Sequence, residues 1–148
     1  MRKLILVLLI LLTPTLLFAE EYNSSITVGL YTHHYVDGEY TEGIDNKLIA
    51  IEHKGWNFAD FVNSHGNETQ FFGYGWHTKK IESEDADDWW VRGNIYLGVL
   101  VGYGDHHPIH LGAISPGLYP TGSIGYKRYS LEVGVMPGFV WSGVKIEF

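Results

Sequence analysis

Two short segments carry side chains that could perform acyl chemistry. Residues 30–37 contain the adjacent histidines His33 and His34, and residues 61–66 contain Ser64. An imidazole beside a serine hydroxyl can activate that hydroxyl as a nucleophile, or can deprotonate a bound alcohol. The pairing is weak evidence by itself, because Asn-Ser-His-Gly is also an ordinary turn composition and polar residues are expected at loop tips.

The elements that must position these side chains show a period-two alternation of apolar and polar residues. It is clearest in residues 89–103, where one face collects Trp89, Val91, Ile95, Leu97, Val99, Val101 and Tyr103. The other face is small or polar, which is typical of a strand with one apolar side. Similar patterns predict strands at 24–34, 43–54, 56–63, 68–78, 110–126, 129–136 and from 140 to Phe148.

About eight such strands predict an all-β fold, an eight-stranded antiparallel up-and-down transmembrane β-barrel. The apolar faces would point to lipid, with aromatic residues at both membrane interfaces. The residues expected to point outward are Val91, Ile95, Leu97, Val99, Val133, Val135, Val144 and Ile146. A soluble β-sandwich is the alternative, since it shares short alternating strands. Its surface would have to expose these apolar faces to water, which favours the barrel.

In an up-and-down barrel the strands 24–34 and 56–63 end at the same rim, so the histidines and Ser64 are expected to meet there. Both termini would lie at the opposite, periplasmic end. Pro116 and Pro120 fall within the strand 110–126. Proline cannot donate to a β-ladder, so weak pairing is expected at that strand.

The start of the chain has the composition of a secretory signal peptide. A basic Met1-Arg2-Lys3 precedes an aliphatic run, and Ala19 offers a small residue for cleavage. We expect residues 1–19 to be the signal peptide and 20–148 the barrel domain, exported to the bacterial outer membrane. The full chain has a formal net charge of −7, which becomes −9 without Arg2 and Lys3.

This charge, without any Lys/Arg-rich stretch, argues against a nucleic-acid partner. The chain has no cysteine, which excludes disulfides and thiol chemistry. The run from His106 to His110 has no accompanying cysteine or paired carboxylates, so a polar loop is expected there, with no metal and no cofactor. The expected partners are membrane lipids and the outer-membrane insertion machinery, with the barrel a monomer.

The stretch Phe61-Val62-Asn63-Ser64, followed by Gly73-Tyr74-Gly75-Trp76, resembles the lipid A palmitoyltransferase (PagP) family. That family has a Phe, any residue, Asp-Ser, and then Gly-Tyr-Gly-Trp at the same distance. Gly122-Ser123-Ile124-Gly125-Tyr126 and Met136-Pro137-Gly138 are similar to a second set of its motifs. The resemblance extends over nearly all of residues 20–148.

The resemblance implies an outer-membrane acyltransferase that moves a fatty acyl chain from phospholipid to lipid A or a related outer-leaflet acceptor. It implies a base at His34 or His33, with His34 preferred because it stands at the strand-to-loop junction. It implies a nucleophile or positioning hydroxyl at Ser64. Asn63 stands where the family has Asp.

The resemblance also implies the site that receives the acyl chain. The family glycine that forms the floor of the acyl pocket corresponds to Gly75. The prolines that weaken strand pairing and admit lipid sideways correspond to Pro120 and Pro137. Only residues 20–25 precede the first strand, where the family has an amphipathic helix. This departure and Asn63 favour an alternative, a structural or adhesion barrel without the chemistry. A lipid hydrolase is the third possibility.

Overall fold

A computed structural model describes residues 24–36, 38–40, 42–82, 88–103 and 108–148. The expected signal peptide, 1–19, lies outside the described residues, as do His106 and His107. The elements are β1 (Ser24–His34), the 3₁₀-helix η1 (Ile44–Asn46), β2 (Ile49–His53), β3 (Trp56–Val62), β4 (Glu68–His77), β5 (Ile81–Glu82), β6 (Trp89–Val101), β7 (Ile114–Tyr126), β8 (Tyr129–Met136) and β9 (Phe139–Glu147).

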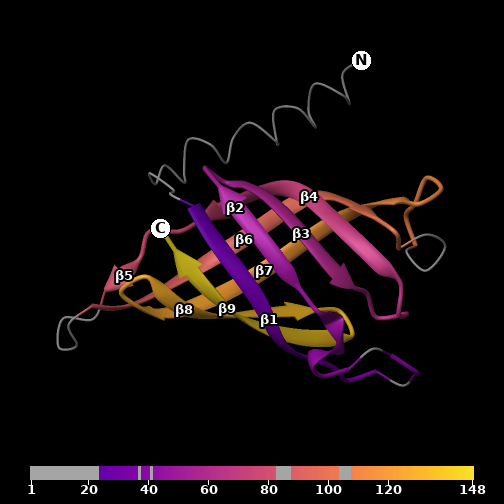
Figure 1. Cartoon of the computed structure of the whole chain (residues 1–148), viewed down its shortest axis with the longest axis horizontal. Helices are drawn as coiled ribbons and strands as arrows, with labels where there is room; N and C mark the ends of the chain where they lie inside the picture. Colours follow the sequence, from indigo (N-terminus) through magenta and orange to yellow (C-terminus); the bar gives the residue numbers. More distant parts are fainter. Residues whose placement is uncertain (1–23, 37, 41, 83–87, 104–107) are drawn as a thin grey trace, which may run out of the picture.

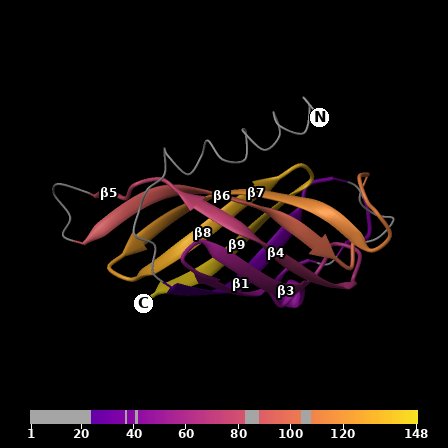
Figure 2. The same ribbon diagram turned by 90° about the horizontal axis from the view of Figure 1, so that it is seen from above.

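The strands form an antiparallel sheet that closes on itself. Its order is β4-β3-β2-β1-β9-β8-β7-β6, and a further ladder between β4 and β6 completes the barrel (Figures 1 and 2). The short β5 adds to β6 through Ile81↔Val91 and Glu82↔Trp90. Backbone hydrogen bonds of 2.9 and 2.8 Å join Ser24 to Phe148, so the first and last described residues lie together at one end. The predicted eight-stranded barrel is confirmed.

Alternating burial along β2, β4, β7 and β8 confirms the predicted faces. On β8, Ser130, Glu132 and Gly134 point inward, while Val133 and Val135 are exposed on the outer wall. Of the residues predicted to point outward, Leu97 is half-buried, and the exposed ones are Val91, Ile95, Val99, Val133, Val135, Val144 and Ile146. The barrel therefore has an apolar outer surface and a mixed interior.

Two strands begin several residues later than predicted. The strand expected at 43–54 begins only at Ile49, because residues 44–46 form η1 and Lys47 takes a left-handed conformation with φ 48°. The Asn46 side chain turns into the barrel and donates to the Thr32 hydroxyl, which holds this break in place. The strand expected at 110–126 begins at Ile114.

In the described part of the chain, no helix has both the length and the apolar character needed to cross a membrane.

The two prolines of β7 leave its ladder with β6 intact. The register runs without interruption from Trp89↔Tyr126 to Val101↔Ile114 and includes Ile95↔Pro120 and Val99↔Pro116. On the other side, the register between β7 and β8 stops at Thr121↔Gly134. Successive residues of a strand direct their N–H groups alternately to the two neighbouring strands. Pro116 and Pro120 are four positions apart, so the N–H groups that they lack would both have pointed to the same neighbouring strand. The expected weak pairing is therefore confined to the seam between β7 and β8.

The end of the barrel near the termini is filled by buried charges and their hydrogen bonds. Lys145 Nζ lies 3.0 Å from Glu132 Oε2 and 3.7 Å from Glu52 Oε2. His77 Nε2 lies 2.7 Å from Glu52 Oε1, and its Nδ1 lies 2.8 Å from Asn94 Oδ1. Opposed charges and mutual hydrogen bonds make this burial tolerable. The other half of the interior contains a cavity.

Candidate functional site

A β-bulge in β1 decides which of the two histidines enters the barrel. The register between β1 and β9 shifts between Gly29 and Tyr31, which leaves Leu30 as an extra residue. An extra residue reverses the side-chain alternation beyond it. Thr32 and His34 are consequently buried. The His33 side chain is 56% exposed, whereas that of His34 is 3% exposed.

His34 links a serine to a carboxylate. Its Nε2 lies 2.8 Å from Ser64 Oγ, and its Nδ1 lies 3.2 Å from Glu42 Oε1. Donation of Nδ1–H to Glu42 leaves Nε2 to accept the Ser64 hydroxyl proton. The three side chains come from the end of β1, the following loop and the loop after β3. A hydroxyl, an imidazole and a carboxylate are thus connected in the order that covalent acyl chemistry would require.

Glu42 is the residue that the sequence-based prediction missed. Its carboxylate accepts the His34 backbone N–H at 2.9 Å in addition to contacting the ring, and its Oε2 lies 3.5 Å from His33 Nδ1. The backbone hydrogen bond, followed by the hydrogen bond and charge of the His34 ring, lowers the pKa of Glu42 below its ordinary value of 4.5. The sequence contains one clue to this contact, because an acidic residue eight positions after His34 can return to the histidine if the loop between them folds back onto β1.

Asn63 supports the loop that carries Ser64. Its Oδ1 accepts the backbone N–H groups of His65 at 2.9 Å and Asn67 at 3.1 Å. Its Nδ2 donates to Thr69 Oγ1 at 2.9 Å and to the Gly102 carbonyl at 3.4 Å. These bonds direct the buried side chain of Asn63 toward the turn, while Glu42 occupies the place beside His34. Asn63 is therefore positioned to hold Ser64 in place.

Aromatic rings pack around the His34 imidazole. Tyr40 stacks on it with ring centroids 4.4 Å apart and an angle of 18° between the planes. Phe139 packs at 5.3 Å from another side, and Tyr40 also contacts His65 edge-on at 5.9 Å. The rings restrict rotation of the imidazole and shield it from water, so its hydrogen bonds to Ser64 and Glu42 have a fixed direction.

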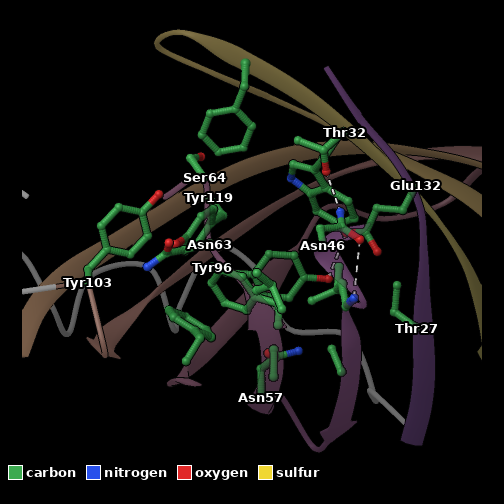
Figure 3. A pocket seen from close by; sticks show the side chains of 18 residues that line it. Thr27, Thr32, Asn46, Asn57, Asn63, Ser64, Tyr96, Tyr103, Tyr119 and Glu132 are labelled. Atoms are coloured by element: carbon green, nitrogen blue, oxygen red, sulfur yellow. Dashed lines mark hydrogen bonds between the residues drawn. The ribbon is translucent and has the colours of Figure 1, made fainter. Parts of the chain in front are cut away.

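A cavity of about 110 Å³ extends from Ser64 into the barrel. Figure 3 shows Ser64 near one end of its lining and Asn57 near the other. Its apolar and aromatic lining consists of Leu48, Ala50, Ala59, Phe61, Val62, Phe71, Tyr96, Tyr103, Tyr119, Phe139 and Trp141. Its polar lining consists of Thr27, Thr32, Asn46, Asn57, Asn63, Ser64 and Glu132. A mainly apolar cavity that reaches the Ser64 hydroxyl has a lining suited to a hydrocarbon chain.

Gly75 points inward, as the strand alternation predicted, but lies beneath a ring. A Cβ atom on Gly75 would come within 2.7 Å of Tyr96 Cε1, and Tyr96 lines the cavity. Other inward glycines are covered in the same way, Gly73 by Phe71 and Gly134 by Trp141. The resemblance implies that Gly75 forms the floor of the acyl pocket, but Gly73, Gly75 and Gly134 are all outside the lining of the cavity, because neighbouring aromatic rings occupy the space beside them.

Pro120 and Pro137 lie at two ends of the incomplete seam between β7 and β8. Pro120 precedes Thr121, the last β7 residue in register with β8. Pro137 and Gly138 form the turn between β8 and β9, whose pairing continues to Met136↔Phe139. Pro137 therefore interrupts no pairing within its own hairpin, and the unpaired stretch lies between β7 and β8.

Metal ligation has no support in the part of the chain that the structure describes, where no group of three or more His, Cys, Asp or Glu residues could hold an ion. His110 Nδ1 lies 3.3 Å from the Gly112 carbonyl in an exposed turn.

Neither a protein-family model nor a curated protein matches this chain.

Proposed function

We propose that this protein is an outer-membrane acyltransferase that moves a fatty acyl chain from a phospholipid to lipid A or a related outer-leaflet acceptor. The observation that carries the proposal is the chain of contacts Ser64–His34–Glu42 at the mouth of a mainly apolar cavity. The resemblance of residues 61–76 to the lipid A palmitoyltransferase family is consistent with it.

The proposed reaction has two halves. His34 Nε2 takes the proton of Ser64 as Oγ bonds to the donor's ester carbonyl carbon. The ester C–O bond then breaks, and the lysophospholipid leaves with that proton. In the second half an acceptor hydroxyl gives its proton to His34 and bonds to the acyl carbon, and Ser64 leaves and is reprotonated. Glu42 holds the imidazole in the required tautomer and stabilises its charged form.

The barrel offers the donor a route that is consistent with a membrane location. An apolar outer wall suits lipid, and we propose that a chain passes sideways into the interior beyond Thr121↔Gly134, where the register between β7 and β8 stops. The acyl chain would occupy the cavity, with its ester at Ser64. Export to the outer membrane further requires the proposed signal peptide at residues 1–19.

Mass spectrometry of lipid A from cells with and without the protein tests the proposal. One added acyl chain is expected, and Ser64→Ala and His34→Ala should each abolish it. His33→Ala is the matched control, because the neighbouring histidine faces outward and the product should persist. Heat-modifiable migration on a gel would establish that each variant is folded. Unchanged lipid A from a folded wild-type barrel contradicts the transferase.

A lipid hydrolase is a second candidate, favoured by the exposure of the mouth. Glu42 is 43% exposed and Ser64 is half-buried, so water could reach the acyl-serine. Free fatty acid and lysophospholipid without acylated lipid A would favour hydrolysis.

A further inference from the structure

Ser64 lies between two hollows of different chemistry. The cavity described above extends into the barrel, and a second hollow of about 480 Å³ lies on the loop side. The lining of the second is Gly38, Glu39, Tyr40, Glu42, Ser64, His65 and Gly66. We name it the outer pocket. Ser64 is shared by both, so a group bound in the outer pocket would face an acyl chain attached to that serine.

The outer pocket differs in polarity from the cavity. Glu39 and Glu42 provide carboxylates, and Tyr40 provides an aromatic ring fixed by its stacking on His34. Gly66 has φ 80°, and a Cβ placed there would meet nothing within 4 Å, so this side of the pocket is open. Carboxylates accept hydrogen bonds from hydroxyl groups, and an aromatic ring offers an apolar face to the C–H groups of a sugar.

The charge of the surrounding loops points away from anionic ligands. Among the described residues of segments 35–48, 63–67, 102–113 and 137–138, Lys47 is the single Lys or Arg. The described acidic residues of these segments are Glu39, Glu42 and Asp45. Proteins usually bind phosphate through Arg or Lys, so a phosphate or carboxylate group has little to attract it to this rim.

We propose that the outer pocket is the acceptor subsite, and that it takes the uncharged hydroxyl-bearing part of a sugar or other polyol. This inference rests on the proposed acyl transfer. In a phosphorylated acceptor such as lipid A, the phosphates would stay outside the pocket while an uncharged portion enters. The Glu39 carboxylate contributes to the selectivity for uncharged acceptors. Glu42 also lines the outer pocket and at the same time contacts His34.

Two acceptors that differ at C6 of the sugar, where one carries a neutral hydroxymethyl group and the other a carboxylate, test the subsite, and the Glu39 variants isolate the contribution of charge. The purified full chain in mixed micelles with phosphatidylcholine as donor would be given octyl β-glucoside or octyl β-glucuronide, and acylated glycoside quantified by mass spectrometry. The neutral glucoside should have the higher kcat/KM. Glu39→Gln should lower the ratio of kcat/KM for the glucoside to kcat/KM for the glucuronide about two- to fivefold, the range expected for one exposed charge. Glu39→Lys should lower this ratio further.

Glu68→Gln is the matched control, since Glu68 is exposed at the start of β4, beyond the lining of the outer pocket. It should leave the preference unchanged. Equal kcat/KM for the two glycosides, or an equal effect of the two Glu→Gln changes, would overturn the subsite. Fatty acid release with neither glycoside acylated would also overturn it while leaving donor cleavage intact. Failure to consume the donor would instead overturn the proposed function itself.

Discussion

The ring of Tyr96 covers Gly75, so that a Cβ atom on Gly75 would lie 2.7 Å from Cε1 and 2.8 Å from Cδ1 of the ring. The Tyr96 hydroxyl accepts from Lys145 Nζ at 2.6 Å and donates to Glu132 Oε1 at 3.0 Å. Tyr96 therefore lies at the boundary between the cavity, which Glu132 also lines, and the charged half of the barrel. In the proposed reaction, the Tyr96 ring limits how deep the acyl chain can reach, and the absence of a side chain at Gly75 leaves space for that ring.

Gly75→Ala should consequently shorten the acyl chain that is accepted, because the added methyl group pushes the Tyr96 ring toward the cavity. The ring is anchored through its hydroxyl, so destabilisation of about 1–3 kcal/mol should accompany the change. Chain preference would be measured with phospholipids of graded acyl length.

Tyr96→Leu should admit longer chains, and Gly75→Ala should have little further effect in that background. If Gly75→Ala shortened the accepted acyl chain equally in the wild-type and Tyr96→Leu backgrounds, residue 75 would limit the chain length by itself and without the Tyr96 ring.

Lys145→Met should destabilise the folded barrel strongly. The substitution leaves Glu132 and Glu52 buried without their cation, and breaking a buried ion pair typically costs about 3–5 kcal/mol. Lys127→Met is the matched control, because Lys127 and Asp88 form a 3.4 Å pair with side chains that are 57% and 50% exposed. Denaturant unfolding in detergent would measure both. Similar losses of stability would contradict the structural role of Lys145.

The pH dependence of the Glu42 contact follows from its lowered pKa. A carboxylate whose folded pKa lies below its unfolded value stabilises the fold above about pH 4.5, and this contribution is lost as the pH falls through the lower folded value. NMR titration of the Glu42 carboxyl would follow it. In His34→Ala the pKa should rise only in part, since the backbone N–H of residue 34 remains. A pKa that does not change would assign the whole effect to the backbone.

Asn63→Asp should weaken the site even though the resembling family has Asp at this position. The carboxylate would keep the acceptor role toward His65 and Asn67 but would face the Gly102 carbonyl, to which Asn63 Nδ2 donates at 3.4 Å. An unsatisfied buried polar group costs about 1–3 kcal/mol. Unfolding and acyl-transfer assays would be compared with Asn63→Ala, which removes all these bonds. Higher activity in Asn63→Asp would contradict the loop-holding role.

The alternation of residue types by itself determined the barrel class. Period-two patterns depend on local order along a strand, and the observed faces of β6 and β8 follow them directly. The meeting of residues 34 and 64 at one rim followed from up-and-down connectivity, which is also a property of strand order. These features need no knowledge of how distant side chains pack.

Only the tertiary structure decided between His33 and His34, because one extra residue at Leu30 reverses the alternation and its place depends on the partner strand β9. Glu42 joined the site through a loop that turns back on β1, a contact that strand periodicity does not encode. The role of Gly75 depended on where the Tyr96 ring from β6 came to rest. Sequence patterns predict the direction of a side chain, whereas the space that it occupies depends on its neighbours across the barrel.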